Sequence, residues 1–496
     1  MENRSPGQFN LQQHFDKFRK HIVGIEACFQ SPYGRMPVVY ADWIASGRLY
    51  GPIEDKLKNQ FGPMVGNTHS EATQTGRTMT LAYHQAQKLI KEHVHADEHD
   101  VIITTGSGMT SALAKFQRIL GLRIPEQLSE YCELPFEEKP VVFITHMEHH
   151  SNHTPWLESI CDVVVVEPGE NLLIDPENLR KAIFKYRKRK LKIGSFSACS
   201  NVTGIITPYH QLAEIMHQYG GYCFVDFAAS APYVQINMHP ANKEQKLDAI
   251  FFSPHKFLGG PGSSGVLVFC KGLYRNRIPD HPGGGTVLWT NPWGGHSYFD
   301  DIELREDGGT PGFLQAIRTA LAIELKNQME VDNIQDREYI LISRVFDKLR
   351  KIPHLSILGD NGQHRIGVFS FYIQGLHHNL IVKLLNDRFG IQVRGGCSCA
   401  GTYGHFLLNV DRDTSQRITA KINQGDLSEK PGWVRMSIHP TMTDSELEYI
   451  LEGIASVARH AGEWSEDYLY KAEINEFYHK SNEADLSDSV NSWFAL

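Results

Sequence analysis

Seven short apolar runs recur between residues 101 and 269, at 101–104, 141–145, 163–167, 193–198, 222–227, 249–253 and 265–269. Each has the length of a buried strand. Helical patterns separate several of them, notably at 178–189 and 208–219, and Gly220-Gly221 follows the second helix as a C-cap does. This alternation predicts an α/β fold: a large domain built on a seven-stranded, mostly parallel sheet with helices on both faces.

The pattern changes after residue 313. A long helical stretch runs from 314 towards 350, strand-like runs follow at 367–373, 391–393 and 433–438, and 443–460 has apolar residues at helical spacing. We expect a smaller α+β domain here. The predicted division is an N-terminal segment 1–48 that packs with the small domain, a large domain 49–313, a small domain 314–460 and a tail 461–496. The first segment should contain a polar leader, a short helix and a short strand, and the tail a docked helix with a frayed end.

Composition narrows the class of protein. With 41% hydrophobic and 21% charged residues, the chain is typical of a globular protein, and its net charge of −8 argues against a nucleic-acid partner. The eight cysteines are scattered, which predicts reduced thiols and a cytoplasmic location. The start, MENRSPGQFN, lacks the apolar stretch of a signal peptide, and no run approaches the roughly 20 residues that span a membrane.

Candidate chemistry gathers where the predicted strands end. The run at 101–104 leads through a glycine turn into a helix containing Gly108, Met109 and Thr110, an arrangement that suits a phosphate group. Lys256 follows the run at 249–253 and precedes a glycine-rich turn, and Asp226 lies at the end of 222–227. In parallel sheets ligands bind at this edge. A desolvated lysine, an acid and a phosphate site together suit pyridoxal phosphate (PLP), with Lys256 as the Schiff-base residue. His149 would stack on the ring or handle protons.

An ordered set of motifs strengthens this interpretation: EHHSN (148–152) with Pro155-Trp156, SNVTG (200–204), Val225-Asp226, SPHK (253–256), GGT (284–286), GTP (309–311) and VRGGCSCA (393–400). Over most of residues 38–460 the chain resembles the class V, fold type I PLP enzymes, in the branch of the cysteine desulfurases and selenocysteine lyases.

The resemblance implies a role for each matching residue. Lys256 would hold the cofactor, Asp226 would pair with its pyridine nitrogen, and His149 would stack on the ring. Gly108, Met109, Thr110, Ser253 and His255 would bind the phosphate, with Thr286 reaching across from the other subunit of a homodimer. Asn201, which also faces the cofactor, and Arg394 would hold the substrate carboxylate. Cys399 would accept sulfur from L-cysteine, leaving alanine, and a sulfur-acceptor protein would be a further partner.

Three positions depart from that family. Ala229 stands where a glutamine is usual, and Cys397 stands where a histidine is frequent. The segment 403–432 is longer and more polar than the family pattern, which predicts a different lid over the site. Cys397 would change the reactivity of the Cys399 thiol or act as a resolving thiol for it. The Cys-x-Cys pair has no further ligands at metal-binding spacing, so no metal site is predicted.

Other functions stay open at this point. The main alternative is a class V aminotransferase, or a related PLP enzyme, that acts on another amino acid, with Cys399 non-catalytic. A PLP-binding scaffold without turnover would not need Lys256, Asp226 and His149. A nucleotide-binding oxidoreductase using residues 106–111 would explain neither the lysine nor the cysteine motif.

Overall fold

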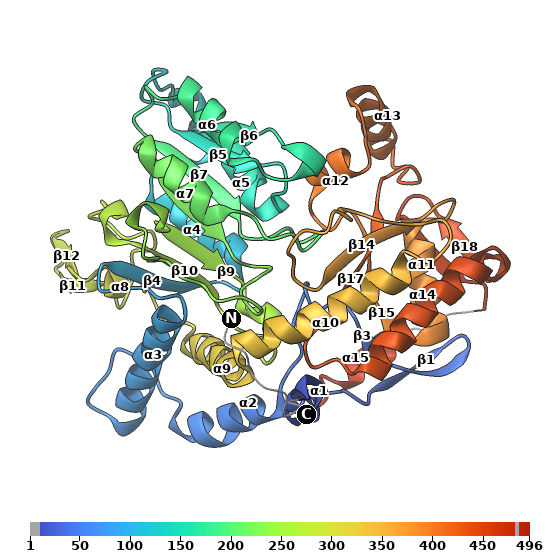
Figure 1. Ribbon diagram of the computed structural model, residues 1–496. Coiled ribbons are helices and arrows are strands. Elements are labelled where there is room, and N and C mark those ends of the chain that lie inside the picture. The colour runs from blue at the N-terminus through green and yellow to red at the C-terminus, as the bar shows by residue number, and fades with distance from the viewer. Residues whose placement is uncertain (1–9, 482–485) are drawn as a thin grey trace.

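The structure is a computed structural model that describes residues 10–481 and 486–496 (Figure 1). The expected leader at residues 1–9 lies outside the described residues. No described helix is both long and apolar enough to cross a membrane.

The large sheet has the strand order β4-β10-β9-β8-β7-β5-β6. Its strands are β4 (Asp100–Thr105), β5 (Val141–Thr145), β6 (Asp162–Val166), β7 (Lys192–Ser197), β8 (Tyr222–Asp226), β9 (Ala249–Phe252) and β10 (Gly265–Cys270). Strands β9, β8, β7, β5 and β6 are parallel, whereas β10 is antiparallel to both of its neighbours. The predicted seven-stranded, mostly parallel sheet is confirmed.

The orientation of β10 follows from its connection to β9. A parallel crossover usually runs through an α-helix that packs on the sheet. The β9–β10 connection contains only the short 3-10 turn Pro254–Lys256 and a glycine-rich loop, so the chain reverses instead. Lys256 therefore lies in a tight turn against the sheet.

Helices cover both faces of this sheet. Buried side chains of α3 (Gln74–His93), α6 (Pro176–Lys185), α7 (Tyr209–Gln218) and α9 (Phe313–Met329) join one apolar cluster. Those of α4 (Met109–Ile119) and α5 (Thr154–Leu157) join the cluster on the other face, where Trp156 is fully buried. The C-cap prediction after α7 is also confirmed, because Gly220 has a φ of 66°.

The smaller domain contains an antiparallel sheet of order β13-β14-β17-β16. These strands are β13 (Leu355–Ile357), β14 (Val368–Ile373), β17 (Trp433–Ser437) and β16 (Arg394–Gly396). Helices α10 (Val331–Leu349), α11 (His378–Phe389) and α14 (Asp444–Trp464) lie beside this sheet (Figure 1), and their buried side chains join its apolar core. Helices α12 (Gly401–Leu407) and α13 (Arg412–Asn423) occupy the polar insertion.

The N-terminal segment packs on this smaller domain. Phe15 and Phe18 of α1 (Leu11–Arg19) belong to the core that contains α10, α11 and α14. After a hairpin of β1 (Cys28–Ser31) and β2 (Gly34–Pro37), strand β3 (Val39–Tyr40) pairs in parallel with β15 (Ile391–Gln392). The predicted strand at 391–393 therefore exists, but its partner is β3. The domain limits themselves remain a prediction.

The helical stretch predicted from 314 towards 350 is present as two helices, α9 and α10, which are separated at Glu330, where φ is 61°. The expectation for the tail is wrong. The tail is not mainly a helix: α14 ends at Trp464, and β18 (Tyr468–Lys471) pairs with β19 (Glu476–His479) before the short α15 (Ser487–Ser492). Aromatic residues, which favour strands, explain the hairpin, since the tilted rings of Tyr470 and Phe477 pack across it with their centres 4.7 Å apart.

The segment between the domains carries α8 (Ile302–Arg305) and a second hairpin, β11 (Val287–Thr290) with β12 (His296–Tyr298). This hairpin extends away from the large sheet (Figure 1). A short helix α2 (Gly51–Lys56) precedes α3.

Candidate active site

One pocket lies at the carboxyl edge of the large sheet and is closed by the smaller domain. Its walls come from the strand ends and loops of the sheet, from the N-terminal segment (Ile44, Ala45) and from the smaller domain (Arg394, Ser398, Cys399, Arg435). Most of the residues that the sequence singled out line it: Met109, Thr110, His149, Asn201, Asp226, Ser253, His255, Lys256, Arg394 and Cys399. The sheet edge therefore gathers the predicted residues as expected.

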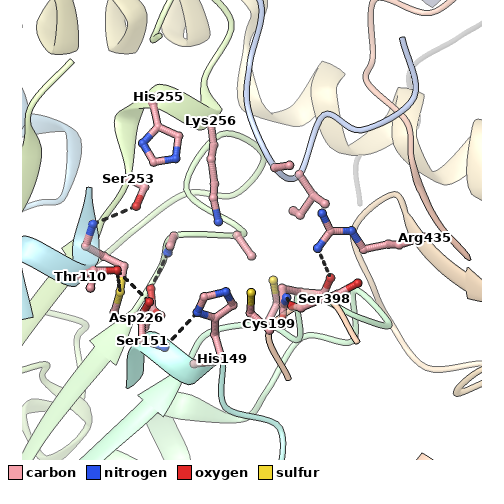
Figure 2. Close-up of a pocket in the computed structure, with 18 of the residues that line it drawn as sticks. Thr110, His149, Ser151, Cys199, Asp226, Ser253, His255, Lys256, Ser398 and Arg435 are labelled. Carbon is pink, nitrogen blue, oxygen red and sulfur yellow. Dashed lines mark hydrogen bonds between the residues drawn. The ribbon is translucent and has the colours of Figure 1, made fainter. Parts of the chain in front are cut away.

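Lys256 points into the space between Asp226, His149 and Arg435 (Figure 2). Burial lowers the pKa of its amine, and the carboxylate of Asp226 opposes part of that effect. A lysine with a lowered pKa has a larger share of neutral, nucleophilic amine at neutral pH, as a lysine that forms a Schiff base requires.

Asp226 ends β8 and is 5% exposed. Its Oδ1 accepts a hydrogen bond from the Ala228 backbone N–H at 2.8 Å. Burial nevertheless raises the pKa of the carboxyl to about 7, which the hydrogen bond and Lys256 only partly counter. A carboxylate in such a place is stabilised by a cation, and a protonated pyridine nitrogen is one.

His149 is a neutral imidazole in this pocket. Its Nδ1 accepts a hydrogen bond from the Ser151 backbone N–H at 3.0 Å, so the ring proton resides on Nε2. Burial and the charge of Lys256 lower its pKa to about 3. A neutral, oriented ring suits stacking on a flat aromatic cofactor.

The first turn of α4 lies at one end of the pocket. Helix N-termini present N–H groups without intrahelical partners. The Met109 N–H points to Ser253 Oγ at 2.9 Å, and Thr110 Oγ1 donates to Ser151 Oγ at 2.7 Å (Figure 2). Gly108 precedes them, and a Cβ there would approach Ser253 Oγ to 2.9 Å and the His255 ring to 3.1 Å. Glycine therefore keeps these donors accessible, although Gly108 itself does not line the pocket.

Arg435 is the principal residue that sequence analysis missed. It lies on β17, is 4% exposed, and reaches the pocket from the smaller domain. Its Nη2 is 3.0 Å from Asp42 Oδ1, and Arg394 Nε is 3.0 Å from Asp42 Oδ2. One carboxylate thus holds two arginines. A charged residue inside the apolar run 433–438 was the available signal.

Three buried polar atoms of pocket residues at this end have no hydrogen-bond partner among the described residues: Arg435 Nε, Asn201 Oδ1 and Ser398 Oγ. Buried polar groups are normally paired. Asn201 also donates from Nδ2 to the Ser398 carbonyl at 2.7 Å, so its amide is fixed in place. An unpaired guanidinium N–H beside a half-exposed second arginine is suited to a carboxylate ligand.

The cysteine motif forms a tight loop at the mouth of the pocket. Ser398 and Cys399 both have left-handed backbones, with φ of 52° and 56°. Cys399 is exposed and lines the pocket. Cys397 does not line it, and packs instead beside the apolar cluster that contains Tyr403 and Trp433. A second pocket thiol, Cys199, is buried, and burial raises its pKa to about 12.

Thr286 is the predicted residue that lies apart from this pocket. It is buried in the turn after Gly283, and its Oγ1 donates to the Gly283 carbonyl at 2.7 Å. Ala229 lines the pocket, at the position where the class V enzymes that the sequence resembles have a glutamine. Its methyl group offers no hydrogen bond to a ligand.

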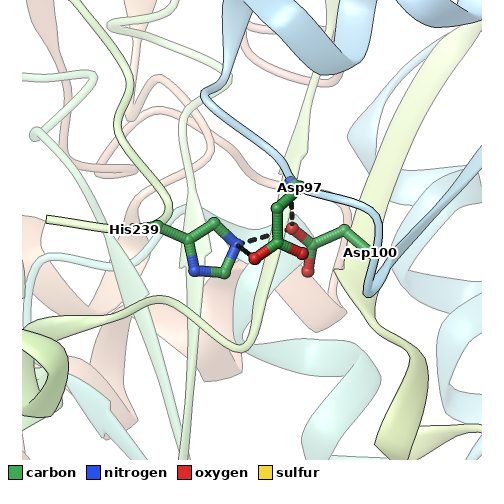
Figure 3. Close-up of side chains that lie close together, drawn as sticks. All are labelled: Asp97, Asp100 and His239. Atoms are coloured by element: carbon green, nitrogen blue, oxygen red, sulfur yellow. Dashed lines mark hydrogen bonds and ion pairs between the residues drawn. The ribbon is translucent and has the colours of Figure 1, made fainter.

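Among the described residues, one group of three has metal-ligand types close together: Asp97, Asp100 and His239 (Figure 3). It lies at the start of β4, whereas the pocket lies at the other end of that strand. His239 Nε2 is 2.6 Å from Asp100 Oδ2 and 3.7 Å from Asp97 Oδ2. A charge-assisted hydrogen bond between His239 and Asp100 explains this geometry.

Residues 39–450 match the family model described as aminotransferase class-V. A probable cysteine desulfurase of Halalkalibacterium halodurans is 29% identical over 373 residues, which cover 73% of this chain and 84% of the relative. A probable cysteine desulfurase of Staphylococcus aureus is 26% identical over 402 residues, covering 77% and 91%.

The fold is also found among solved structures. The apo structure of a cysteine desulfurase from Thermococcus onnurineus has a TM-score of 0.70 at 21% identity, covering 92% of this chain and all of that one. The family model extends over most of the chain, from the β3 strand into α14, and includes every pocket residue named above. The chain therefore belongs to the aminotransferase class-V family.

Proposed function

We propose that this protein is a PLP-dependent cysteine desulfurase, which removes sulfur from L-cysteine, releases alanine and carries the sulfur on Cys399. The observation that carries this proposal is the meeting of Lys256 from the large domain and Cys399 from the smaller domain in one pocket. The relatives named cysteine desulfurase favour this substrate over the amino acid of another class V aminotransferase.

The donors of the pocket fit PLP. The first turn of α4, with Ser253, Thr110 and His255, would hold the phosphate, and the buried carboxyl of Asp226 would meet the ring nitrogen. Lys256 would bind the cofactor aldehyde, with neutral His149 against the ring face. Bound there, PLP would supply an electron sink that stabilises negative charge at the substrate Cα.

The chain's own residues then bind and position the substrate. Arg435 and Arg394 would take its carboxylate, with Asn201 beside them. The amine of Lys256, once free of the cofactor, would move the Cα proton. The Cys399 thiolate would attack the substrate sulfur: the Cys399 S–S bond forms, the substrate C–S bond breaks, and its electron pair goes to the carbon that becomes the methyl group of alanine. A persulfide remains on Cys399 for an acceptor thiol, such as that of a sulfur-acceptor protein.

A homodimer is part of the proposal. The β11–β12 hairpin exposes Leu288 (61%), Trp289 (50%) and Trp293 (88%), an apolar surface of the kind that marks contacts between proteins. Thr286 begins this hairpin region and lies outside its own subunit's pocket, so it would serve the pocket of the second subunit. Light scattering should give twice the mass of one chain for the wild type and a smaller mass for Trp293→Ser.

The direct test measures alanine released from L-cysteine by the purified, PLP-loaded protein. Cys399→Ala should abolish release, whereas Cys397→Ala, a matched change two residues away that does not face the pocket, should retain it. Equal alanine release by the wild type and by Cys399→Ala would show that Cys399 takes no part in the reaction. No release by the wild type, with a spectral change on adding another amino acid, would favour the aminotransferase alternative.

A further inference from the structure

The loop that presents Cys399 has a strained backbone, and one internal hydrogen bond closes it, from the Ala400 N–H to the Cys397 carbonyl at 3.0 Å. Ser398 and Cys399 are consecutive non-glycine residues with positive φ, a conformation that side chains disfavour and that persists only when surrounding structure fixes it. The thiol that would receive sulfur therefore depends on contacts made from outside the loop.

Those contacts come from the large domain. The His150 backbone N–H donates to the Cys399 carbonyl at 2.7 Å, and the Gly401 N–H donates to His150 Nε2 at 2.9 Å. Asn201 Nδ2 donates to the Ser398 carbonyl at 2.7 Å. His150 thus holds the loop at the Cys399 carbonyl through its backbone and at Gly401 through its ring, while Asn201 holds the residue before Cys399.

The ring of His150 must be neutral for the second contact. Its Nε2 accepts a hydrogen bond, which places the proton of the neutral ring on Nδ1. Burial lowers the pKa of His150, and the charge of Lys430 lowers it further, so the accepting form is favoured. Gly401 fits this approach, because a Cβ there would stand 3.2 Å from Nε2.

We propose that His150 is the positioning residue of the sulfur-transfer step: it holds the Cys399 loop against the large domain so that the thiol faces the substrate. This inference rests on the proposed desulfurase function. His150 is not among the residues that line the pocket, whereas its neighbours His149 and Ser151 are. The same short turn therefore fixes His149 inside the pocket and the Cys399 loop at its mouth.

Two variants separate positioning from general structure. His150→Ala removes the acceptor for the Gly401 N–H, and His150→Gln replaces it, because the glutamine carbonyl can occupy the place of Nε2. His150→Ala should lower kcat for alanine release about tenfold and leave KM and the visible absorbance of the bound cofactor unchanged, since a misplaced reacting group slows the step without weakening binding. His150→Gln should recover most of kcat. His153→Ala, which loses only a contact to the Thr402 side chain, should match the wild type.

A second measurement does not depend on activity. Hydrogen exchange of the peptide that contains Gly401 should be at least about tenfold faster in His150→Ala than in wild type, and protected again in His150→Gln. A fast-exchanging Gly401 amide in the wild type, or an unchanged kcat in His150→Ala, would overturn the proposal. A wild type that releases no alanine but shows the expected exchange pattern would overturn the desulfurase function while the contact of His150 with the loop stands.

Discussion

Replacing Asp42 with asparagine tests how the pocket holds its two arginines. Asp42 contacts Arg435 and Arg394 at 3.0 Å each, and its side chain is 12% exposed. Asparagine keeps the shape and one carbonyl acceptor but removes the negative charge, so the Arg435 guanidinium remains buried without a partner of opposite charge.

The two ion pairs contribute unequally. Arg435 is 5% exposed at its side chain, and breaking a buried pair by removing one partner costs about 3–5 kcal/mol. Arg394 is 52% exposed, and such pairs contribute about 0–1 kcal/mol. Since the asparagine carbonyl still accepts one hydrogen bond, we expect Asp42→Asn to lower the free energy of unfolding by about 2–4 kcal/mol.

Urea titration followed by circular dichroism measures this free energy. Asp360→Asn is the matched control: Asp360 pairs with Arg350, which is 51% exposed, so its loss should cost less than about 1 kcal/mol. If Asp42→Asn costs no more than Asp360→Asn, the two arginines are held by something other than Asp42, and the argument from buried charge is wrong.

Other predictions follow from the pocket and the core. Lys256→Ala, purified with PLP, should lack the visible absorbance of the wild type, since no lysine remains in the pocket to bind the cofactor; persisting colour would assign the anchor elsewhere. Arg394→Ala should raise KM for L-cysteine more than it lowers kcat, because Arg394 would bind the substrate carboxylate in the ground state as well as in the transition state. An unchanged KM would show that Arg394 does not bind this carboxylate. Burial raises the pKa of Glu338 from 4.5 to about 8. The folded state therefore keeps a proton that the unfolded chain releases, and this stabilisation is lost as pH rises between those values. In urea titrations, the free energy of unfolding of Glu338→Gln should rise relative to that of the wild type as pH increases across that range. A difference between the two proteins that does not change with pH would contradict the burial of a charged Glu338.

The large sheet was predictable because its strands are buried on both faces. Such strands are continuous apolar runs, and all seven appear within a residue or two of their predicted limits. The residues at the strand ends follow from the same reasoning, since parallel strands place them at one edge, and Lys256 and Asp226 meet there.

The rest of the site depends on long-range contacts that no local pattern reveals. Arg435 and Asp42 are 393 positions apart, and each occurs alone in an apolar stretch. The left-handed backbone at Glu330 interrupts a stretch of helical pattern, and helical preference along the sequence does not reveal such a break.

The pairing of β3 with β15 has a consequence for how the protein is made. A ribosome releases the chain from its N-terminus, so β3 and Asp42 emerge first, and the large sheet through Cys270 can assemble soon afterwards. Strand β15 and Arg435 emerge only after the large sheet and α10 have been made. Until then β3 is an unpaired edge and Asp42 has neither arginine. A nascent chain interrupted before residue 391 would thus hold all seven strands of the large sheet and no complete active site.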